Sequence, residues 1–471
     1  MAQLLAYGTY IPHYRLTRSA IAAALRTGGD RGWRAVASFD EDSTSMAVEA
    51  ARRACRRSDV RPLATYLATT SPAYLDKTNA CVVNAALGMD SAAFAMDVAA
   101  AVRGGAGALI AAHDAPRPTL TVLSDLRGGL PGSADERDGG DGAAAFLFGP
   151  GPGIAEVIGI GAATGEFLDR WRLPADPASR AWEDRFAESV YLPLAQAALT
   201  DALKAAGVGP QDIGHAVITG TNRRAVARFA REAGFTGEVT SDDALGIGNA
   251  GTAQPGLLLA DVFDRAGPDE VIAVSLLADG ATTLLLRTTP ALVEQRDPAR
   301  GATVRAQAAA AGDQLDYTTY LTWRGLLTRE PPRRPDPDAP AAPPSYRNET
   351  WKYHLVASQC DACGTRQLPP ARACVSCGQV DRMSAVPMAD ARATITTFAV
   401  DKLAYTPSPP LVAVVLDFDG GGRLRCQLAD ADPGSVAVGD RVEMTFRRMT
   451  TARGIHNYFW KARPVPEAKR S

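Results

Sequence analysis

The sequence predicts an α/β fold over the first 290 residues, followed by a cysteine-rich ribbon and a small β-barrel. Apolar strand-like stretches alternate with helix-like stretches in the first region. Two Cys-x-x-Cys pairs then occur close together, and short β-rich runs separated by Gly, Pro and Asp follow them. The length of 471 residues suits about three domains.

The first part of the α/β region is expected to begin with a helix that Ser43 caps. Further helices and strands follow from apolar periodicity and from glycine at helix ends. The expected helices are 43–57, 78–88 and 103–113, and the expected strands are 63–70, 94–98, 119–125 and 143–148.

The second part repeats a similar order of elements, which indicates an internal duplication. The expected helices are 190–206, 223–233 and 256–267, and the expected strands are 216–219, 271–277 and 282–287. Strands this apolar need helices on both faces, so we expect a layered helix–sheet–helix body.

A proline-rich segment, PPRRPDPDAPAAPP at 331–344, predicts a linker with extended backbone. After it, β-runs at 393–400, 411–418, 423–428 and 441–446 predict a small antiparallel barrel. The predicted segments are two halves of the α/β body, a helical segment with the linker, the ribbon, and the barrel, at 1–165, 166–290, 291–350, 351–389 and 390–471.

Four of the seven cysteines form the motif CDACG…CVSCG and predict one structural zinc ion. Cys360, Cys363, Cys374 and Cys377 would complete a tetrahedral sphere and leave no position for water. The site would therefore hold the fold together rather than catalyse a reaction.

Composition excludes several classes of function. The formal net charge is −2, and the barrel has no basic stripe interleaved with aromatics, so nucleic-acid binding is not expected. No apolar run is long enough for a membrane span, and the first residues lack the layout of a signal peptide. The remaining cysteines are scattered and do not suggest a disulfide framework. A cytoplasmic protein is expected.

The ribbon with QLPPARACVSCG, and the following LVAVVLDFDGGGRLRCQLADADPGSVAVGDRV, resemble the DUF35 family, a rubredoxin-like zinc ribbon joined to an OB-fold. Proteins of that family associate with thiolase-superfamily enzymes, and they are implicated in acyl-CoA access. The resemblance implies an acyl-CoA-associated module in this chain.

The first 290 residues resemble 3-ketoacyl-ACP synthase III and HMG-CoA synthase, members of the thiolase superfamily. The matching segments, in order, are AYGTYIPHYRL, FDEDSTSMAVEAARRA, AMDVAAAVRGG, GGDGAAAFLFG and GIGNAGTAQPGLLLA. This resemblance implies a duplicated thiolase-type layered α/β/α/β/α body and a coenzyme A thioester as substrate. It also implies a homodimer or higher assembly.

The resemblance departs from the family at its catalytic positions. Where the relatives carry a nucleophilic cysteine at the start of a helix, this chain has Val102. The catalytic histidine position holds Gly220, and the glutamate position of HMG-CoA synthases holds Thr70. A valine cannot form a thioester, and no cysteine lies between Cys81 and Cys360 to replace it.

Several polar residues remain as candidates. Asn249 matches an asparagine that polarises a substrate carbonyl or orients a water in the relatives, and it could also merely shape its loop. Asp279 matches a pocket-lining turn, although an Asp-Gly turn needs no catalytic reason. Tyr74 and Asp76 lie in a loop that approaches the pocket in the relatives. Cys81 is either a core residue or a replacement nucleophile.

Three functions stay open. The first is retro-aldol cleavage of a 3-hydroxyacyl-CoA, for which thiolase-like steroid side-chain aldolases with a DUF35 partner are the precedent. The second is a non-catalytic synthase III/DUF35 subunit of a complex with a separate, active thiolase. The third is a Claisen-type condensing acyltransferase.

Overall fold

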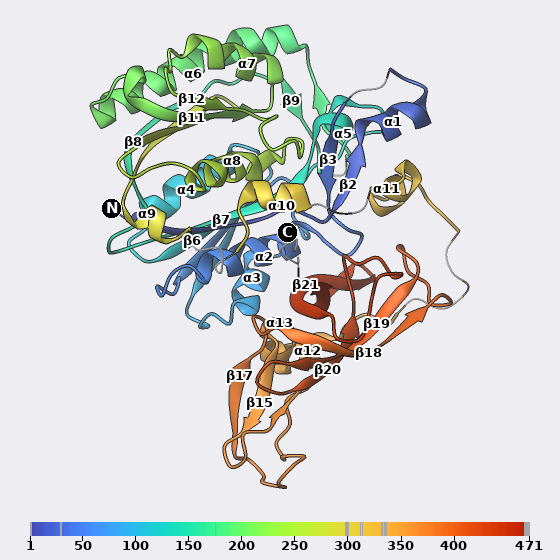
Figure 1. Ribbon diagram of the computed structural model, residues 1–471. Coiled ribbons are helices and arrows are strands. Elements are labelled where there is room, and N and C mark those ends of the chain that lie inside the picture. Colours follow the sequence, from blue (N-terminus) through green and yellow to red (C-terminus); the bar gives the residue numbers. More distant parts are fainter. Residues whose placement is uncertain are drawn as a thin grey trace. The chain divides into compact units, whose positions relative to one another are not determined.

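The computed structural model describes residues 2–28, 31–174, 176–296, 301–310, 312, 314–330, 333 and 337–465 (Figure 1). The chain divides into two compact units. The first consists of the described residues within 1–37, 42–83 and 90–317, and the second of those within 38–41, 84–89 and 318–471. The two units are described separately below.

The first unit contains a ten-stranded sheet in the order β12-β11-β13-β14-β8-β1-β7-β6-β4-β5. One half of the sheet consists of β1 (Gln3–Tyr10), β4 (Ala64–Thr69), β5 (Phe94–Ala99), β6 (Thr119–Leu126) and β7 (Asp141–Gly149). The other half consists of β8 (Ala155–Ala163), β11 (Ile213–Gly220), β12 (Glu238–Thr240), β13 (Val271–Leu277) and β14 (Ala281–Thr288).

The two halves repeat one topology. Numbered along the chain, the strands of each half lie in the order 3-2-4-5-1, and only the fifth strand runs antiparallel to the rest of its half. A single pairing, Leu4 with Ala155, joins the halves through β1 and β8. The strand order is direct evidence of the duplication. Strand β8 belongs to the second half by this order. The sequence had predicted the boundary between the two halves at residue 165, which lies after β8.

Helices cover the faces of both halves and fill the space between them. Helix α2 (Ser43–Cys55) packs on β1 and β7, whereas α6 (Asp184–Ala206) packs on β8 and β14, beside α7 (Arg223–Glu232). Helix α4 (Gly104–His113) and helix α8 (Gln254–Phe263) lie between the two sets of strands, and α8 contacts strands of both halves (Figure 1). This is the layered α/β/α/β/α body that the sequence predicted.

Some boundaries differ from the expectations. Asp42, not Ser43, caps α2, because its carboxylate accepts a hydrogen bond from the Ser45 backbone N–H at 2.8 Å. Helix α6 begins at Asp184 rather than at 190, and it continues through Pro193. The remaining elements of this unit are β2 (Tyr14–Thr17), α1 (Arg18–Leu25), β3 (Trp33–Val36), α3 (Ala80–Ala86), α5 (Ala134–Asp138), β9 (Arg170–Trp171), β10 (Arg180–Ala181), α9 (Ala291–Glu294) and α10 (Val304–Ala310).

The second unit contains a three-stranded ribbon and a five-stranded barrel. The ribbon order is β16-β15-β17, from Arg366–Gln367, Val356–Cys360 and Met383–Pro387. The barrel strands are β18 (Ala393–Asp401), β19 (Leu411–Phe418), β20 (Arg423–Gln427), β21 (Arg441–Ala452) and β22 (Ile455–Pro464), and helices α11 (Tyr317–Trp323), α12 (Ala342–Arg347) and α13 (Glu349–His354) precede the ribbon.

The barrel has the strand order β20-β19-β18-β21-β22, and a bridge between Leu428 and Ala462 closes it. This order is that of an OB-fold. The last strand, β22, was not expected from the sequence. Part of the predicted linker at 331–344 lies outside the described residues, and α12 occupies the end of the remainder.

A cluster of buried charges lies at one side of the barrel. Arg447 contacts Asp40 at 3.3 Å, Glu41 at 3.0 Å and also Asp430, while Lys461 contacts Asp40 at 2.7 Å. Burial alone would raise the pKa of Asp40, but Lys461 and Arg447 hold it well below its ordinary value. The cluster secures residues 38–41 within this unit.

Among the described residues of both units, none of the helices combines the length and the apolar character that crossing a bilayer requires.

Candidate active site

The position of the expected nucleophile lies at the entrance to α4. Strand β5 ends at Ala99, Ala100 has a positive φ of 89°, and the Val102 carbonyl accepts a hydrogen bond from Gly105 at 3.1 Å. The Val102 side chain is 8% exposed. A side chain here lies at the positive end of the helix dipole, a setting that favours a thiolate. This chain places an isopropyl group there instead.

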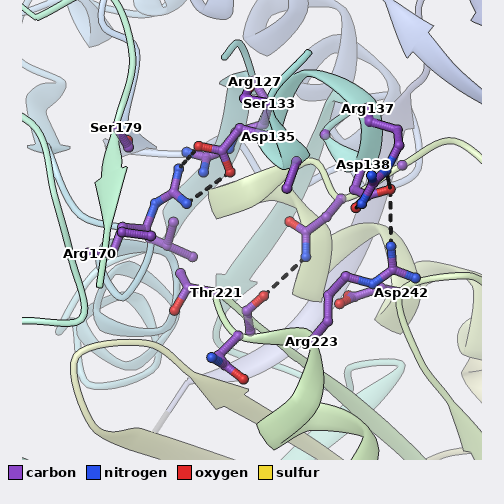
Figure 2. A pocket seen from close by; sticks show the side chains of 18 of the residues that line it. Arg127, Ser133, Asp135, Arg137, Asp138, Arg170, Ser179, Thr221, Arg223 and Asp242 are labelled. Atoms are coloured by element: carbon purple, nitrogen blue, oxygen red, sulfur yellow. Dashed lines mark hydrogen bonds and ion pairs between the residues drawn. The ribbon is translucent and has the colours of Figure 1, made fainter. Parts of the chain in front are cut away.

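Two adjoining cavities open beside Val102, with volumes of about 400 and 440 Å³. Their shared wall consists of Val102, Arg127, Arg170, Ser179 and Thr221. Figure 2 shows the first cavity, where charged side chains from several elements converge. A cavity of this size accommodates the reacting part of a small-molecule substrate.

The structure brings most of the predicted site residues to these two cavities. Gly220 and Asn249 line the first, whereas Thr70 and Asp279 line the second. Tyr74 and Asp76 are not among the residues that line either cavity.

The loop of Tyr74 and Asp76 has its own structural role. Leu75, between them, reaches the second cavity, and Asp76 is exposed. The Tyr74 backbone exchanges hydrogen bonds with the Asn79 side chain at 3.1 and 2.9 Å, which shapes this loop.

Gly220, the position where the resemblance predicts a histidine, has no room for a side chain. Gly220 ends β11 and pairs with Leu277 of β13. A Cβ atom added at Gly220 would lie 2.4 Å from the Leu277 carbonyl oxygen and 2.9 Å from the Leu277 Cβ. Any side chain here would require movement of the paired backbone.

Asn249 shapes its loop by hydrogen bonds, and it also lines the first cavity. Its Nδ2 donates to the Gly220 carbonyl oxygen at 3.2 Å, and its Oδ1 accepts from the Gly251 backbone at 2.8 Å. Backbone hydrogen bonds with Asp138 and Gly140 hold the residue in place. The same amide also favours the charged form of Asp242, so Asn249 links the end of β11 to this carboxyl group.

Thr70, at the glutamate position, belongs to a hydrogen-bond cluster around Asp125. The buried Asp125 carboxylate accepts from the Thr70 hydroxyl at 2.8 Å, from Ser71 at 3.0 Å and from Thr252 at 2.9 Å. Arg127 donates to the Thr70 hydroxyl at 3.0 Å. The Thr70 side chain is therefore fixed by the fold and is a poor general base.

Ion pairs arrange most of the charged groups of the first cavity. Arg170 makes a two-pronged contact with Asp135 at 2.9 and 2.6 Å, and Arg223 contacts Asp138 at 3.1 Å (Figure 2). Pairing of this kind keeps the guanidinium groups ordered, so that they can face an anionic ligand.

A second polar network borders the other cavity. The Tyr191 hydroxyl lies 3.1 Å from the Thr221 hydroxyl and accepts from the Asp279 backbone N–H at 3.2 Å. Burial raises the pKa of Tyr191, and burial likewise raises the pKa of Asp169, which hydrogen-bonds with it. Asp279 itself adopts a positive φ of 49° in the turn between β13 and β14. Neither Asp169 nor Tyr191 lies in a motif, so sequence reasoning had no signal for them.

Asp242 is the other cavity residue that sequence reasoning missed. It lines the first cavity two residues after β12 and is 9% exposed. Burial raises the pKa of Asp242 to about 6, although the Thr219 hydroxyl, the Asn249 amide and Arg223 favour its charged form. A carboxyl group with this pKa can exchange protons near neutral pH.

Cys81 does not reach these cavities. It lies exposed on α3, and none of the residues described as lining either cavity is a cysteine. Cys81 is therefore neither a core residue, as one interpretation expected, nor close to a bound substrate.

The four ribbon cysteines converge as predicted. Their sulfur atoms all lie within 4.8 Å of one another, with Cys360 and Cys377 3.6 Å apart and Cys363 and Cys374 3.5 Å apart. Four sulfurs bonded tetrahedrally to zinc at about 2.3 Å would be separated by nearly this distance. The donor set therefore fits a four-cysteine zinc site.

Comparison with known families agrees with this division of the chain. The family model of the ChsH2 rubredoxin-like zinc ribbon domain matches residues 352–381, and that of the ChsH2 C-terminal OB-fold domain matches residues 385–447.

The first unit resembles curated enzymes over nearly their whole length. The hydroxymethylglutaryl-CoA synthase of Aeropyrum pernix is 30% identical over 343 residues, which cover 68% of this chain and 93% of the relative. This chain belongs to the hydroxymethylglutaryl-CoA synthase family. Another family member, from Pyrobaculum neutrophilum, is 29% identical over 347 residues, covering 69% of this chain and 97% of the relative.

Solved structures share the fold of this hydroxymethylglutaryl-CoA synthase family member. MvaS in complex with 3-hydroxy-3-methylglutaryl coenzyme A superposes with a TM-score of 0.59 at 20% identity, covering 71% of this chain and 94% of MvaS. The 3-oxoacyl-[acyl-carrier-protein] synthase III of Aquifex aeolicus gives 0.53 at 20% identity, covering 61% and 100%. The chain is thus a thiolase-fold body fused to a zinc ribbon and an OB-fold.

Proposed function

We propose that this protein cleaves a carbon–carbon bond in a 3-hydroxyacyl-CoA by a retro-aldol reaction, without an acyl-enzyme intermediate. The observation that carries the proposal is Val102 at the start of α4, on the wall shared by both cavities. An acyl-enzyme needs a thiol or hydroxyl at that point, and valine has neither.

Retro-aldol cleavage requires groups that the cavities offer. A base must take the proton of the 3-hydroxyl group, and hydrogen-bond donors must hold the thioester enolate that forms. The Asn249 amide and several arginine side chains border the first cavity. These donors support binding of a thioester oxygen.

Coenzyme A thioesters are the proposed substrate class. The relatives are named as hydroxymethylglutaryl-CoA synthases, and solved structures of this fold contain 3-hydroxy-3-methylglutaryl coenzyme A or CoA. Arginine side chains suit the phosphates of such a ligand. We further propose that zinc in the ribbon is structural, and that the chain forms a homodimer or higher assembly.

The test is a cleavage assay on the zinc-loaded, full-length protein. Branched 3-hydroxyacyl-CoAs of several chain lengths are the substrates, and mass spectrometry detects the shorter acyl-CoA together with the released ketone or aldehyde. We expect cleavage of at least one substrate, and a large loss of activity in Asn249→Ala. Absence of both products across the panel would refute the proposal.

A condensing acyltransferase is the second candidate, because sequence similarity to a hydroxymethylglutaryl-CoA synthase covers 68% of this chain and 93% of that relative. Condensation through an acyl-enzyme would leave a covalent acyl group on the protein. Intact-protein mass spectrometry after exposure to acetyl-CoA distinguishes this candidate from the lyase, for which no adduct is expected.

A non-catalytic subunit is the third candidate, and the packed Gly220 favours it because the family's base has no space there. Such a subunit would co-purify from its host with a separate thiolase that retains its cysteine. An isolated protein with lyase activity would exclude this candidate.

A further inference from the structure

We infer that Asp242 is the proton-transfer residue of the first cavity, and that through it the protein exchanges the C2 protons of a short acyl-CoA with solvent. The inference rests on one part of the proposed function, namely that a CoA thioester binds in this cavity. It gives Asp242 a role in proton transfer, and it adds an activity that can be measured separately from cleavage.

The position of Asp242 supports this role. One carboxylate oxygen, Oδ1, accepts a hydrogen bond from the Thr219 hydroxyl. Thr219 immediately precedes Gly220, so Asp242 lies against the strand end where the relatives carry their histidine. The carboxylate therefore occupies the neighbourhood of the missing imidazole, although it comes from a different segment of the chain.

The other carboxylate oxygen supports a ligand at this point. Oδ2 is buried and has no hydrogen-bond partner among the described residues. Buried carboxylate oxygens without partners are rare, because desolvation is costly when no hydrogen bond replaces water. Asp242 lines the cavity, so its carboxyl group is adjacent to the space that a bound molecule would occupy.

Two other carboxylates of the first cavity already have cationic partners. Asp135 is paired with Arg170, and Asp138 is paired with Arg223. A paired carboxylate is a weak base, since the cation stabilises its charged form. Asp242 differs from them because its environment favours the protonated form more strongly.

The charges around Asp242 come from two neighbours. Arg223 at the start of α7 favours the carboxylate, while Asp243 on the same loop disfavours it. Asp243 is itself paired with Arg223 at 3.2 Å and is 74% exposed. The burial of Asp242 outweighs these effects, so both protonation states are accessible near neutral pH.

Asp242 alone can carry out both proton transfers of the cleavage. Its carboxylate takes the proton of the 3-hydroxyl group, the C2–C3 bond breaks, and the electron pair of that bond forms the thioester enolate. The C3 fragment leaves as a ketone or aldehyde. The enolate then takes the same proton at C2, so the shorter acyl-CoA is released and Asp242 returns to its carboxylate form. In reverse, Asp242 removes a C2 proton from the shorter acyl-CoA.

The test uses propionyl-CoA in D₂O with the full-length, zinc-loaded protein. Mass spectrometry follows deuterium at C2 over a pH series. We expect exchange by the natural protein, with a rate that rises as pH passes through about 6, and a loss of about 100-fold in Asp242→Asn. The matched control, Asp201→Asn, removes the same charge at an exposed position of α6 outside both cavity linings, and it should keep both the exchange rate and its pH profile.

The outcomes separate this inference from the proposed function. Exchange that persists in Asp242→Asn, or absence of exchange by the natural protein, overturns the inference even where 3-hydroxyacyl-CoA is cleaved. Exchange that Asp242→Asn abolishes supports it even where the cleavage panel gives no product. Thermal unfolding of both variants checks that they are folded.

Discussion

The side-chain amide of Asn249 donates a hydrogen bond to the backbone carbonyl oxygen of Gly220, at 3.2 Å. The family resemblance predicts an asparagine and a histidine at these two positions. Asn249 matches the first, whereas Gly220 contributes only its backbone at the second. The first cavity therefore contains a positioned amide, and the Val102 side chain offers it no thiol.

Val102→Cys should create a reactive thiol without creating a condensing enzyme. The new sulfur would lie at the N-terminus of α4, where the helix dipole lowers a thiol pKa. We expect the introduced thiol to react with iodoacetamide faster than the exposed Cys81, which serves as the internal reference. Peptide mass spectrometry measures both rates. Condensation of acetyl-CoA by this variant would contradict the view that the family's base is missing.

Gly220→Ala should destabilise the first unit. The added Cβ would lie 2.4 Å from the Leu277 carbonyl oxygen, so the pairing of β11 and β13 must distort. We expect a loss of about 1–3 kcal/mol in unfolding free energy, measured by chemical denaturation. The control is Gly107→Ala on α4, where nothing lies within 4 Å of the new Cβ. That change should raise stability by up to about 1 kcal/mol.

Asp242→Asn should be more stable than the natural protein above pH 6. The folded state raises the pKa of Asp242 from 3.8 to about 6, so ionisation opposes folding. This penalty is absent below about pH 4, grows between pH 4 and 6, and is complete above pH 6. We expect a gain on the order of 2 kcal/mol at pH 7, which disappears at pH 4. An equal gain at both pH values would contradict this account.

Acid should weaken the second unit through Asp40. Lys461 and Arg447 depress the pKa of this carboxyl group in the folded state, although burial opposes them. The stabilisation is therefore present above the unfolded pKa of about 3.9 and is lost as pH falls below it. Asp40→Ala should cost about 3 kcal/mol at pH 7, because it leaves Lys461 without this partner in a buried place. Urea unfolding at pH 7 and pH 3 measures both effects.

Cys374→Ser should abolish binding of one zinc ion. The remaining three sulfurs cannot complete a tetrahedral sphere, and the ribbon should lose its folded structure. Elemental analysis gives the zinc content, and proteolysis of the region around 356–387 reports the unfolding. The control Cys81→Ser lies outside the ribbon and should keep one zinc per chain.

The sequence predicted the fold class because the apolar strands and the paired cysteines are local patterns. It missed β8, whose segment AEVIGIGAA contains two glycines that lower strand propensity. The structure explains why these two positions are glycine. A Cβ at Gly159 or Gly161 would lie 2.5 or 2.0 Å from carbonyl oxygens of α6, so only glycine lets this helix pack on the strand.

The candidate site was predicted less completely, for a different reason. Val102, Gly220, Thr70 and Asn249 belong to segments that resemble a family, and the structure gathers them around two cavities. Asp242 belongs to no motif. Burial raises the pKa of Asp242 and outweighs the hydrogen bond from Thr219, which lies more than twenty residues earlier in the chain. No local sequence pattern reports burial or a contact of that kind. The catalytic roles of all these residues stay predictions.

The close approach of Gly220 to Leu277 also limits how the cavity can be redesigned. A histidine introduced at 220 would have to separate two hydrogen-bonded strands to fit. Placing an imidazole at this point would therefore require a change in the backbone as well as a substitution.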